Sequence, residues 1–146
     1  MIKITFDTSA LLAFFKGEEE ATDVKLLLDE CERRRAEGII STLLLTEVYY
    51  ILARVDIERA EKRFIQLDES ILVKRDVDRA VAKKAGELKA KHAGVSIVDC
   101  VVAATALVSG TPYVVVSEKD IRHFRAIGEI EAKTPREVFA YFGRIP

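Results

Sequence analysis

The sequence has little cysteine and histidine. Its 146 residues contain two of each: Cys31, Cys100, His92 and His123. These four form neither a Cys-x-x-Cys pair nor any other zinc-ligand spacing, so no structural zinc site is expected. Both cysteines lie among apolar neighbours, which predicts that they are small core residues. Without a ligand spacing, neither histidine is assigned a catalytic role.

Positive charge is not in excess either. The chain has 23 lysines and arginines against 24 aspartates and glutamates, a net charge of −1. This balance argues against a protein that binds nucleic acid tightly through charge alone. It does not argue against a nuclease, because a bound metal ion supplies positive charge at the site itself.

The chain also lacks a long uninterrupted apolar run. The longest, residues 95–108, is broken by Asp99 and Thr105 and is too short to cross a bilayer. The first residues, 2–6, have the pattern of a strand and not of a signal peptide. We therefore expect a cytoplasmic protein without a membrane segment.

Thermolabile side chains are rare. Asparagine is absent, and the chain has one glutamine and one methionine alongside many lysine, arginine and glutamate residues. Such avoidance is typical of proteins from thermophiles and predicts a thermophilic source. It carries no information about activity.

Short apolar segments alternate with helical patterns along the chain. Strands separated by helices require crossover connections, which place the strands parallel and the helices on both faces. We predict an α/β fold, a three-layer α/β/α sandwich with a short, mostly parallel sheet, formed by one domain over residues 1–146. The expected strands are 2–6, 38–41, 70–73, 113–117 and 129–132, and the expected helices are 10–15, 19–37, 42–54, 57–66, 76–92, 97–109 and one that starts after Thr134.

The helix ends carry recognisable signals. Gly38 is the expected stop of helix 19–37. Asp76 is the expected N-cap of helix 76–92, and Ser96 that of helix 97–109. Thr134-Pro135-Arg136-Glu137 has the pattern of a capping box with proline at the first helical position.

Acidic residues stand where predicted strands end or predicted helices begin. In a parallel α/β sheet the carboxyl ends of the strands share one edge, and ligands bind there. Carboxylates that meet at that edge repel one another unless protons or cations compensate them. Mg²⁺ or Mn²⁺, which prefer oxygen ligands, are the expected compensating ions. The acids concerned are Asp7, Glu47, Asp99, Glu118 and Asp120.

Asp7 and Glu47 each have two interpretations. Asp7 follows the first strand in an Asp-Thr-Ser triplet, which suits a metal ligand and equally suits a plain N-cap. Ser9, in the same triplet, could orient a metal-bound water or a carboxylate. Glu47 lies inside an apolar helical run, so its side chain either projects into a site or faces solvent on a narrow polar stripe.

Asp99 and the acids after the 113–117 strand are similarly open. Asp99 lies in the most apolar helix, where an unpaired carboxylate needs a partner, a metal or a raised pKa. Its structural alternative is a first-turn acid satisfied by backbone amides, in a capping box with Ser96. Glu118 and Asp120 flank Lys119, so one of the two is predicted to bind metal while the other caps the following helix.

Taken together, these segments resemble the PIN-domain family of metal-dependent ribonucleases, particularly its small VapC-type toxins. The similar segments are 4–12, 40–49, 95–106 and 114–117, in that order. The resemblance implies a sheet flanked by helices, an acidic pocket for Mg²⁺ or Mn²⁺, and endonucleolytic cleavage of RNA. Asp7, Glu47 and Asp99 would be metal-site acids, with Glu118 as a further ligand and Ser9 and Ser117 hydrogen-bonded around them.

The fourth acid departs from the family pattern. The family commonly has Thr or Ser, any residue, and then Asp, whereas Lys119 occupies that third place here. Either Glu118 or Asp120 would then be the fourth acid. If the chain is a toxin, the resemblance also implies a homodimer and a small antitoxin protein.

Other classes remain open. A PIN-like module that has lost catalysis and binds RNA or a protein would tolerate the irregular fourth position. A receiver domain needs an acceptor Asp after its third strand, where this chain has Lys74-Arg75. A haloacid-dehalogenase-like phosphatase needs Asp-x-Asp after its first strand, where this chain has Asp7-Thr8-Ser9. Both of these fit less well than the ribonuclease.

Overall fold

A parallel five-stranded sheet forms the centre of the structure. The computed structural model describes residues 1–142, so residues 143–146, which the predicted domain includes, lie outside the described residues. The strand order is β3-β2-β1-β4-β5, and every neighbouring pair is parallel. This confirms the predicted fold class; the order itself was not predictable. The strands are β1 Ile2–Phe6, β2 Ala36–Ser41, β3 Val73–Arg75, β4 Tyr113–Val115 and β5 Glu131–Lys133.

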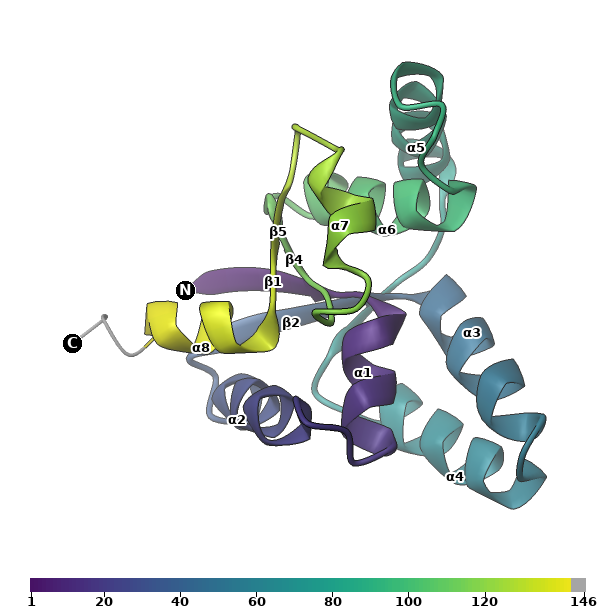
Figure 1. Ribbon diagram of the computed structural model, residues 1–146, viewed down its shortest axis with the longest axis vertical. Helices are drawn as coiled ribbons and strands as arrows, with labels where there is room; N and C mark the ends of the chain where they lie inside the picture. Colours follow the sequence, from purple (N-terminus) through teal and green to yellow (C-terminus); the bar gives the residue numbers. More distant parts are fainter. Residues whose placement is uncertain (143–146) are drawn as a thin grey trace.

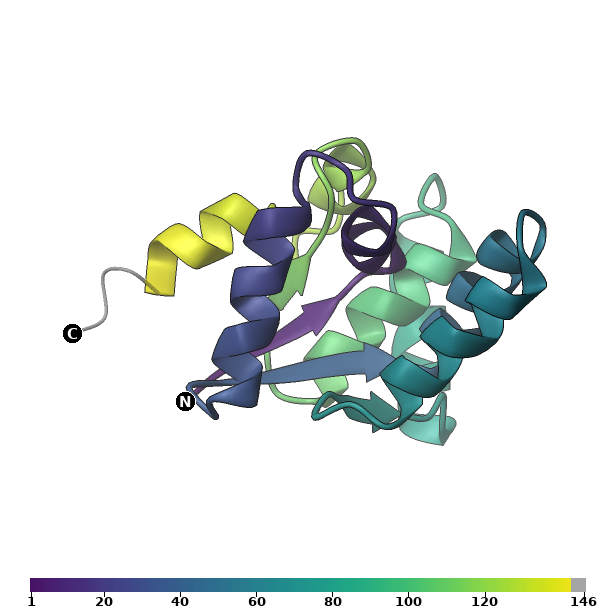
Figure 2. The ribbon, with the colours of Figure 1, turned by 90° about the horizontal axis from the view of Figure 1, so that it is seen from below.

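Helices cover both faces of this sheet. Figures 1 and 2 show α5, α6 and α7 on one side of the sheet and α1, α2 and α4 on the other. None of the described helices combines the length and hydropathy needed to span a bilayer. The helices are α1 Thr8–Phe15, α2 Ala21–Glu32, α3 Thr42–Ala53, α4 Ile57–Asp68, α5 Arg79–Lys91, α6 Ile97–Val108, α7 Ile121–Arg125 and α8 Pro135–Phe142.

Each face of the sheet has its own hydrophobic core. Side chains alternate along a strand, so Val115 packs with the α1–α4 side while Val114 and Val116 pack with α5, α6 and α7. Cys31 belongs to the first core and Cys100 to the second, and both are buried and free. The prediction that the cysteines are core residues is confirmed.

The predicted end of the helix 19–37 is wrong. Helix α2 ends at Glu32, because Arg34 adopts a left-handed conformation (φ 58°) that terminates it, and β2 already begins at Ala36. Gly38 therefore lies inside β2 and does not stop a helix. A Cβ at this position would lie 2.5 Å from Leu72 Cδ2 and 2.9 Å from Cys31 Sγ, so the glycine permits close packing of α2 and the β3 segment.

The segment around β3 also differs from expectation. Ser70 forms a turn, since its hydroxyl donates to Leu67 O and accepts from Leu72 N, and the strand starts only at Val73. Helix α5 is capped by Asp78, whose carboxylate accepts from the Val81 amide, and not by Asp76. Both competing residues are aspartates, and the pattern alone did not separate them.

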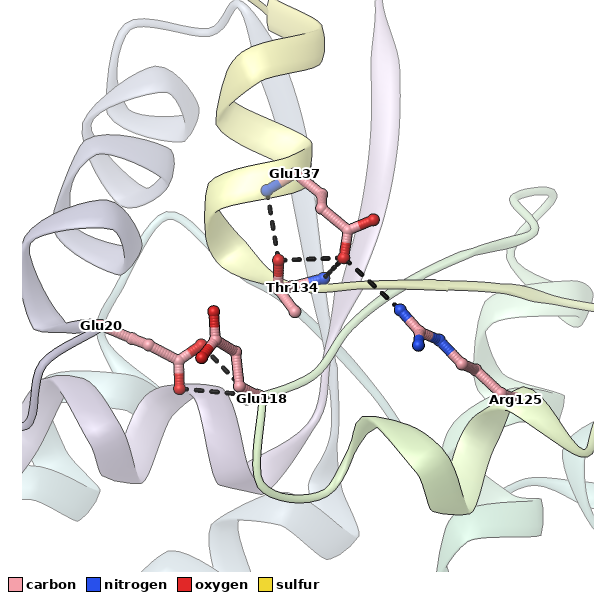
Figure 3. A network of polar contacts seen from close by, with 5 residues as sticks. All are labelled: Glu20, Glu118, Arg125, Thr134 and Glu137. Carbon is pink, nitrogen blue, oxygen red and sulfur yellow. Dashed lines mark hydrogen bonds and ion pairs between the residues drawn. The ribbon is translucent and has the colours of Figure 1, made fainter.

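Helix α1 starts at Thr8 and α2 at Ala21, each two residues from its predicted start, whereas the predicted caps of α6 and α8 are confirmed. Ser96 caps α6 through the Asp99 amide. At α8, Thr134 Oγ1 accepts from the Glu137 amide while Glu137 Oε1 accepts from the Thr134 amide, the reciprocal bonds of a capping box. Figure 3 shows this box beside Arg125 of α7, whose guanidinium lies 3.7 Å from Glu137 Oε1.

Candidate functional site

Asp7 stands at the carboxyl end of the central strand and is almost fully buried. Its amide continues the sheet by donating to Val115 O at 2.9 Å, and its Oδ2 accepts from the Ser9 amide at 3.1 Å. Asp7 is thus the N-cap of α1, as one of its two interpretations required. This bond uses one carboxylate oxygen and leaves the other available, so the cap does not exclude a metal-binding role.

The electrostatic surroundings of Asp7 are unfavourable to its charge. Burial raises its pKa from the ordinary 3.8 to about 6, against the lowering effect of hydrogen bonding by Ser9. The charges of Asp99 and Glu47 contribute to this rise in pKa, which shows that the three acids interact.

Glu47 is held toward Asp7 by a residue that sequence reasoning missed. It is half-buried on α3, and its Oε1 accepts from the hydroxyl of Thr8 at 2.6 Å. Thr8 is itself buried in the first turn of α1. The Glu47 side chain therefore contacts the first turn of α1 and does not lie on a fully solvated polar stripe. The Asp-Thr-Ser triplet was the only available signal for Thr8.

Asp99 lies in the first turn of α6 and is half-buried. Its amide donates to Ser96 Oγ at 3.1 Å. Burial raises the pKa of Asp99 and the charge of Asp120 raises it further, while hydrogen bonding by Ser96 and the neighbouring His123 lower it. Asp99 is thus close enough to Asp120 and His123 to respond to both.

The two acids after β4 point to different places. Glu118 is exposed, and its amide donates to both carboxylate oxygens of Glu20 at 3.2 Å, as Figure 3 shows. Asp120 is half-buried and makes no side-chain bond to the amides of α7, so the expected cap of this helix is not formed. Lys119 lies beside Glu18, with its Nζ 3.4 Å from Oε2.

A single cavity of about 570 Å³ brings four of the five predicted acids together. They are Asp7, Glu47, Asp99 and Asp120, and Glu118 does not line the cavity. Among the residues that the structure describes, no lysine or arginine lines it. The other lining residues are Thr8, Ser9, Ser96 and His123, and Leu12, Ile51, Gly94, Val95, Val98 and Phe124.

Ser9 and Ser117, the two serines predicted to surround the acids, also contact each other, while the Ser9 amide donates to Asp7. Ser9 Oγ accepts from the Ser117 amide at 3.0 Å, which ties the start of α1 to the end of β4. The sequence assigns His123 no role, because no other potential metal ligand stands at a ligand spacing from it. Its place on α7 nevertheless puts it in the wall of the cavity.

The donor chemistry of the cavity suits a hard divalent cation. Carboxylate and hydroxyl oxygens predominate among its polar groups, and no described lysine or arginine in the lining offsets the charge of Asp7, whose pKa is raised by burial. Within residues 1–142, however, no three acidic, histidine or cysteine side chains converge closely enough to hold an ion as they stand. The residues fit Mg²⁺ or Mn²⁺ because their side chains offer oxygen ligands and line the same cavity.

A family model identifies the family of the chain. The model described as the PIN domain matches residues 4–128. This chain belongs to the PIN domain family. No curated protein sequence matches it significantly.

Solved structures with the PIN domain's architecture are similar over nearly the whole chain. The DNA-bound VapBC of Salmonella typhimurium has a TM-score of 0.69 at 23% identity, covering 92% of this chain and 99% of that one. VapBC2 of Rickettsia felis, bound to a promoter DNA fragment, has a TM-score of 0.68 at 17% identity, covering 91% and 98%. VapBC-1 of nontypeable Haemophilus influenzae has a TM-score of 0.69 at 13% identity, covering 92% of this chain and 99% of that one. At these identities the likeness establishes the fold of the PIN domain.

Proposed function

We propose that this PIN-domain protein is a metal-dependent endoribonuclease that hydrolyses RNA phosphodiester bonds. One observation carries the proposal: Asp7, Glu47, Asp99 and Asp120, from four separate parts of the chain, line one cavity that no described lysine or arginine neutralises. Clustered carboxylates of this kind need a cation. A phosphodiester, itself an anion, would approach such a cavity only with that cation in place.

The position of each acid in the cavity suggests its role. Asp7 and Asp99 would hold Mg²⁺ or Mn²⁺, and Asp120 would be the fourth acid in place of Glu118. Glu47, fixed by the Thr8 hydroxyl, would bind the ion or orient a water beside it. A divalent ion in this cavity would supply an activated water and neutralise charge on the leaving 3′ oxygen. The expected products carry 5′ phosphate and 3′ hydroxyl ends.

The similarity to VapBC complexes supports a toxin that pairs with a small antitoxin protein. The acidic cavity is open to such a partner, whose binding would block access of RNA. We also propose that the protein forms a homodimer and acts in the cytoplasm. Co-expression with the product of a neighbouring short gene, followed by purification and mass measurement, tests the partner and the dimer.

A catalytically inactive PIN module that binds RNA or a protein is the second candidate. Its support is the displaced fourth acid, together with the lack of three converged ligands in residues 1–142. Such a module would bind its partner equally well with and without divalent metal.

The deciding experiment is cleavage of a panel of end-labelled RNAs in Mn²⁺, in Mg²⁺ and in chelator. Asp99→Asn and Asp120→Asn should abolish metal-dependent cleavage, while Glu118→Gln, two residues from Asp120 but outside the cavity, should leave it intact. Calorimetry with Mn²⁺ accompanies each variant. If the folded wild type binds no Mn²⁺ and cleaves none of the RNAs, the nuclease is rejected and the binding module stands.

A further inference from the structure

The loop between β4 and α7 is held from outside by side chains near the two ends of α1. In this loop the Ser117 amide donates to Ser9 Oγ at 3.0 Å and the Glu118 amide donates to the Glu20 carboxylate. Inside the loop, the Asp120 amide donates to Ser117 O at 3.1 Å, which closes a turn. The direction in which this turn presents its acids therefore depends on the two external acceptors.

The side chain of Glu20 is available to the loop because it does not cap its own helix, to which Glu20 contributes only its backbone carbonyl. It occupies the N-cap position of α2 but makes no side-chain bond to the α2 amides. Both of its carboxylate oxygens instead lie 3.2 Å from the Glu118 nitrogen. A hydrogen bond from an amide to an ionised acceptor is stronger than one between neutral groups.

The segment that carries Glu20 is itself firmly attached to α1. The Glu18 amide donates to Ala13 O at 2.9 Å, and the Ala21 amide donates to Glu18 O at 2.9 Å. Gly17, with φ of 63°, allows the tight reversal between the two helices. Glu20 thus provides a fixed acceptor.

The Glu20 carboxylate accepts this hydrogen bond in surroundings that disfavour its negative charge. Burial raises the pKa of Glu20, and the charges of Glu118, Glu18 and Asp23 raise it further, against the lowering effect of the Glu118 amide. Figure 3 shows the Glu118 side chain lying beside the Glu20 carboxylate, and Glu118 is not among the residues that line the cavity. The nearby pair of Lys119 and Glu18 is exposed and contributes little.

We propose that Glu20 is a positioning residue: by holding the Glu118 amide, it turns Glu118 outward and leaves Asp120 as the acid that faces the cavity. Asp120 then takes the role that the family pattern gives to the third residue of its Thr/Ser-x-Asp sequence, a position that Lys119 holds in this chain. The consequence for metal binding rests on the proposed function, whereas the attachment of the loop does not.

Three variants test this inference. Glu20→Ala removes the acceptor, Glu20→Gln keeps one acceptor oxygen without the charge, and Glu19→Ala removes a charge from the exposed neighbouring residue. Hydrogen exchange of the Glu118 amide, followed by NMR, reports the attachment itself. We expect roughly tenfold faster exchange in Glu20→Ala only, because an amide without its acceptor opens more readily.

Mn²⁺ affinity, measured by calorimetry, reports the effect on Asp120. Loss of an outer hydrogen bond to a ligand segment lowers metal affinity by about 10- to 100-fold, so Glu20→Ala should bind Mn²⁺ about tenfold more weakly. Glu20→Gln should recover most of this affinity, and adding Glu20→Ala to Asp120→Asn should cause no further loss.

The outcomes separate the two proposals. Equal Glu118 exchange in Glu20→Ala and Glu19→Ala overturns the positioning role, as does a Gln variant that behaves like Ala. Failure of the wild type to bind Mn²⁺ overturns the proposed function, and the exchange rates still decide whether Glu20 holds the loop.

Discussion

Replacing Asp7 by asparagine should make the metal-free protein more stable at neutral pH. The buried carboxylate has a pKa raised from 3.8 to about 6, which corresponds to about 3 kcal/mol against its charged form. Asparagine caps a helix about as well as aspartate, so the bond to the Ser9 amide survives. Loss of the charge at the α1 N-terminus removes up to about 1 kcal/mol of favourable dipole interaction. The net gain is roughly 2 to 3 kcal/mol.

The pH dependence follows from the sign of the pKa shift. Because the folded pKa of Asp7 lies above its unfolded value, the folded state binds more protons between about pH 4 and 6, and wild-type stability falls as the pH rises through this range. Below pH 3.8 the carboxyl group is neutral in both states. The advantage of Asp7→Asn should therefore be full above pH 7 and nearly absent at the acid end.

Urea unfolding in chelator between pH 4 and 8 measures this directly, with thermal melts as a second readout. At pH 7 the melting temperature should rise by roughly 4 to 12 °C. Asp56→Asn is the matched control, since Asp56 caps α4 through an exposed side chain. A stabilisation that does not change with pH, or one that Asp56→Asn reproduces, would refute the reasoning. Saturating Mn²⁺ should reduce the difference in stability between Asp7→Asn and the wild type, because only the wild type gains stability from the ion.

Three further changes test the packing and the site. Thr8→Val removes the hydroxyl that holds Glu47, and it should lower stability by about 1 kcal/mol and weaken Mn²⁺ binding, measured by urea unfolding and calorimetry. Gly38→Ala forces a Cβ within 2.5 Å of Leu72 and should cost about 1 to 3 kcal/mol in the same unfolding assay; an unchanged midpoint would contradict the packing argument. Thr134→Ala breaks the capping box of α8 and should cost about 1 kcal/mol, whereas Thr134→Ser should cost less than half of that.

Features decided by neighbours in sequence were predictable, and features decided by distant contacts were not. Ser96 and the Thr134 box were recognised because a cap and its amides lie within three residues of each other. Gly38 was misassigned because glycine both ends helices and permits close packing. The contacts that decide between these roles come from Leu72 and Cys31, which the local pattern does not include.

The same distinction applies to the site. The edge rule for parallel sheets correctly placed Asp7 and Asp99 in one cavity, because strand ends and helix starts fix them. The choice between Glu118 and Asp120 was left open by the sequence, since the amide of Glu118 is held by Glu20, 98 positions away. His123 was missed for a similar reason, because its neighbour Asp99 belongs to another helix.

The central place of β1 has a consequence for the order in which this molecule matures. Strand β1 pairs with β2 on one side and, on the other, with β4, which is made much later, and the bond between Ser9 and Ser117 spans 108 positions. Contacts of such long range form late and slow the folding of a chain. A growing chain that has not yet reached β4 carries Asp7 and Glu47 but no assembled acidic cavity. If the cavity cleaves RNA, the ribosome that makes the protein is not exposed to the activity until β4 and the loop that carries Asp120 have been made.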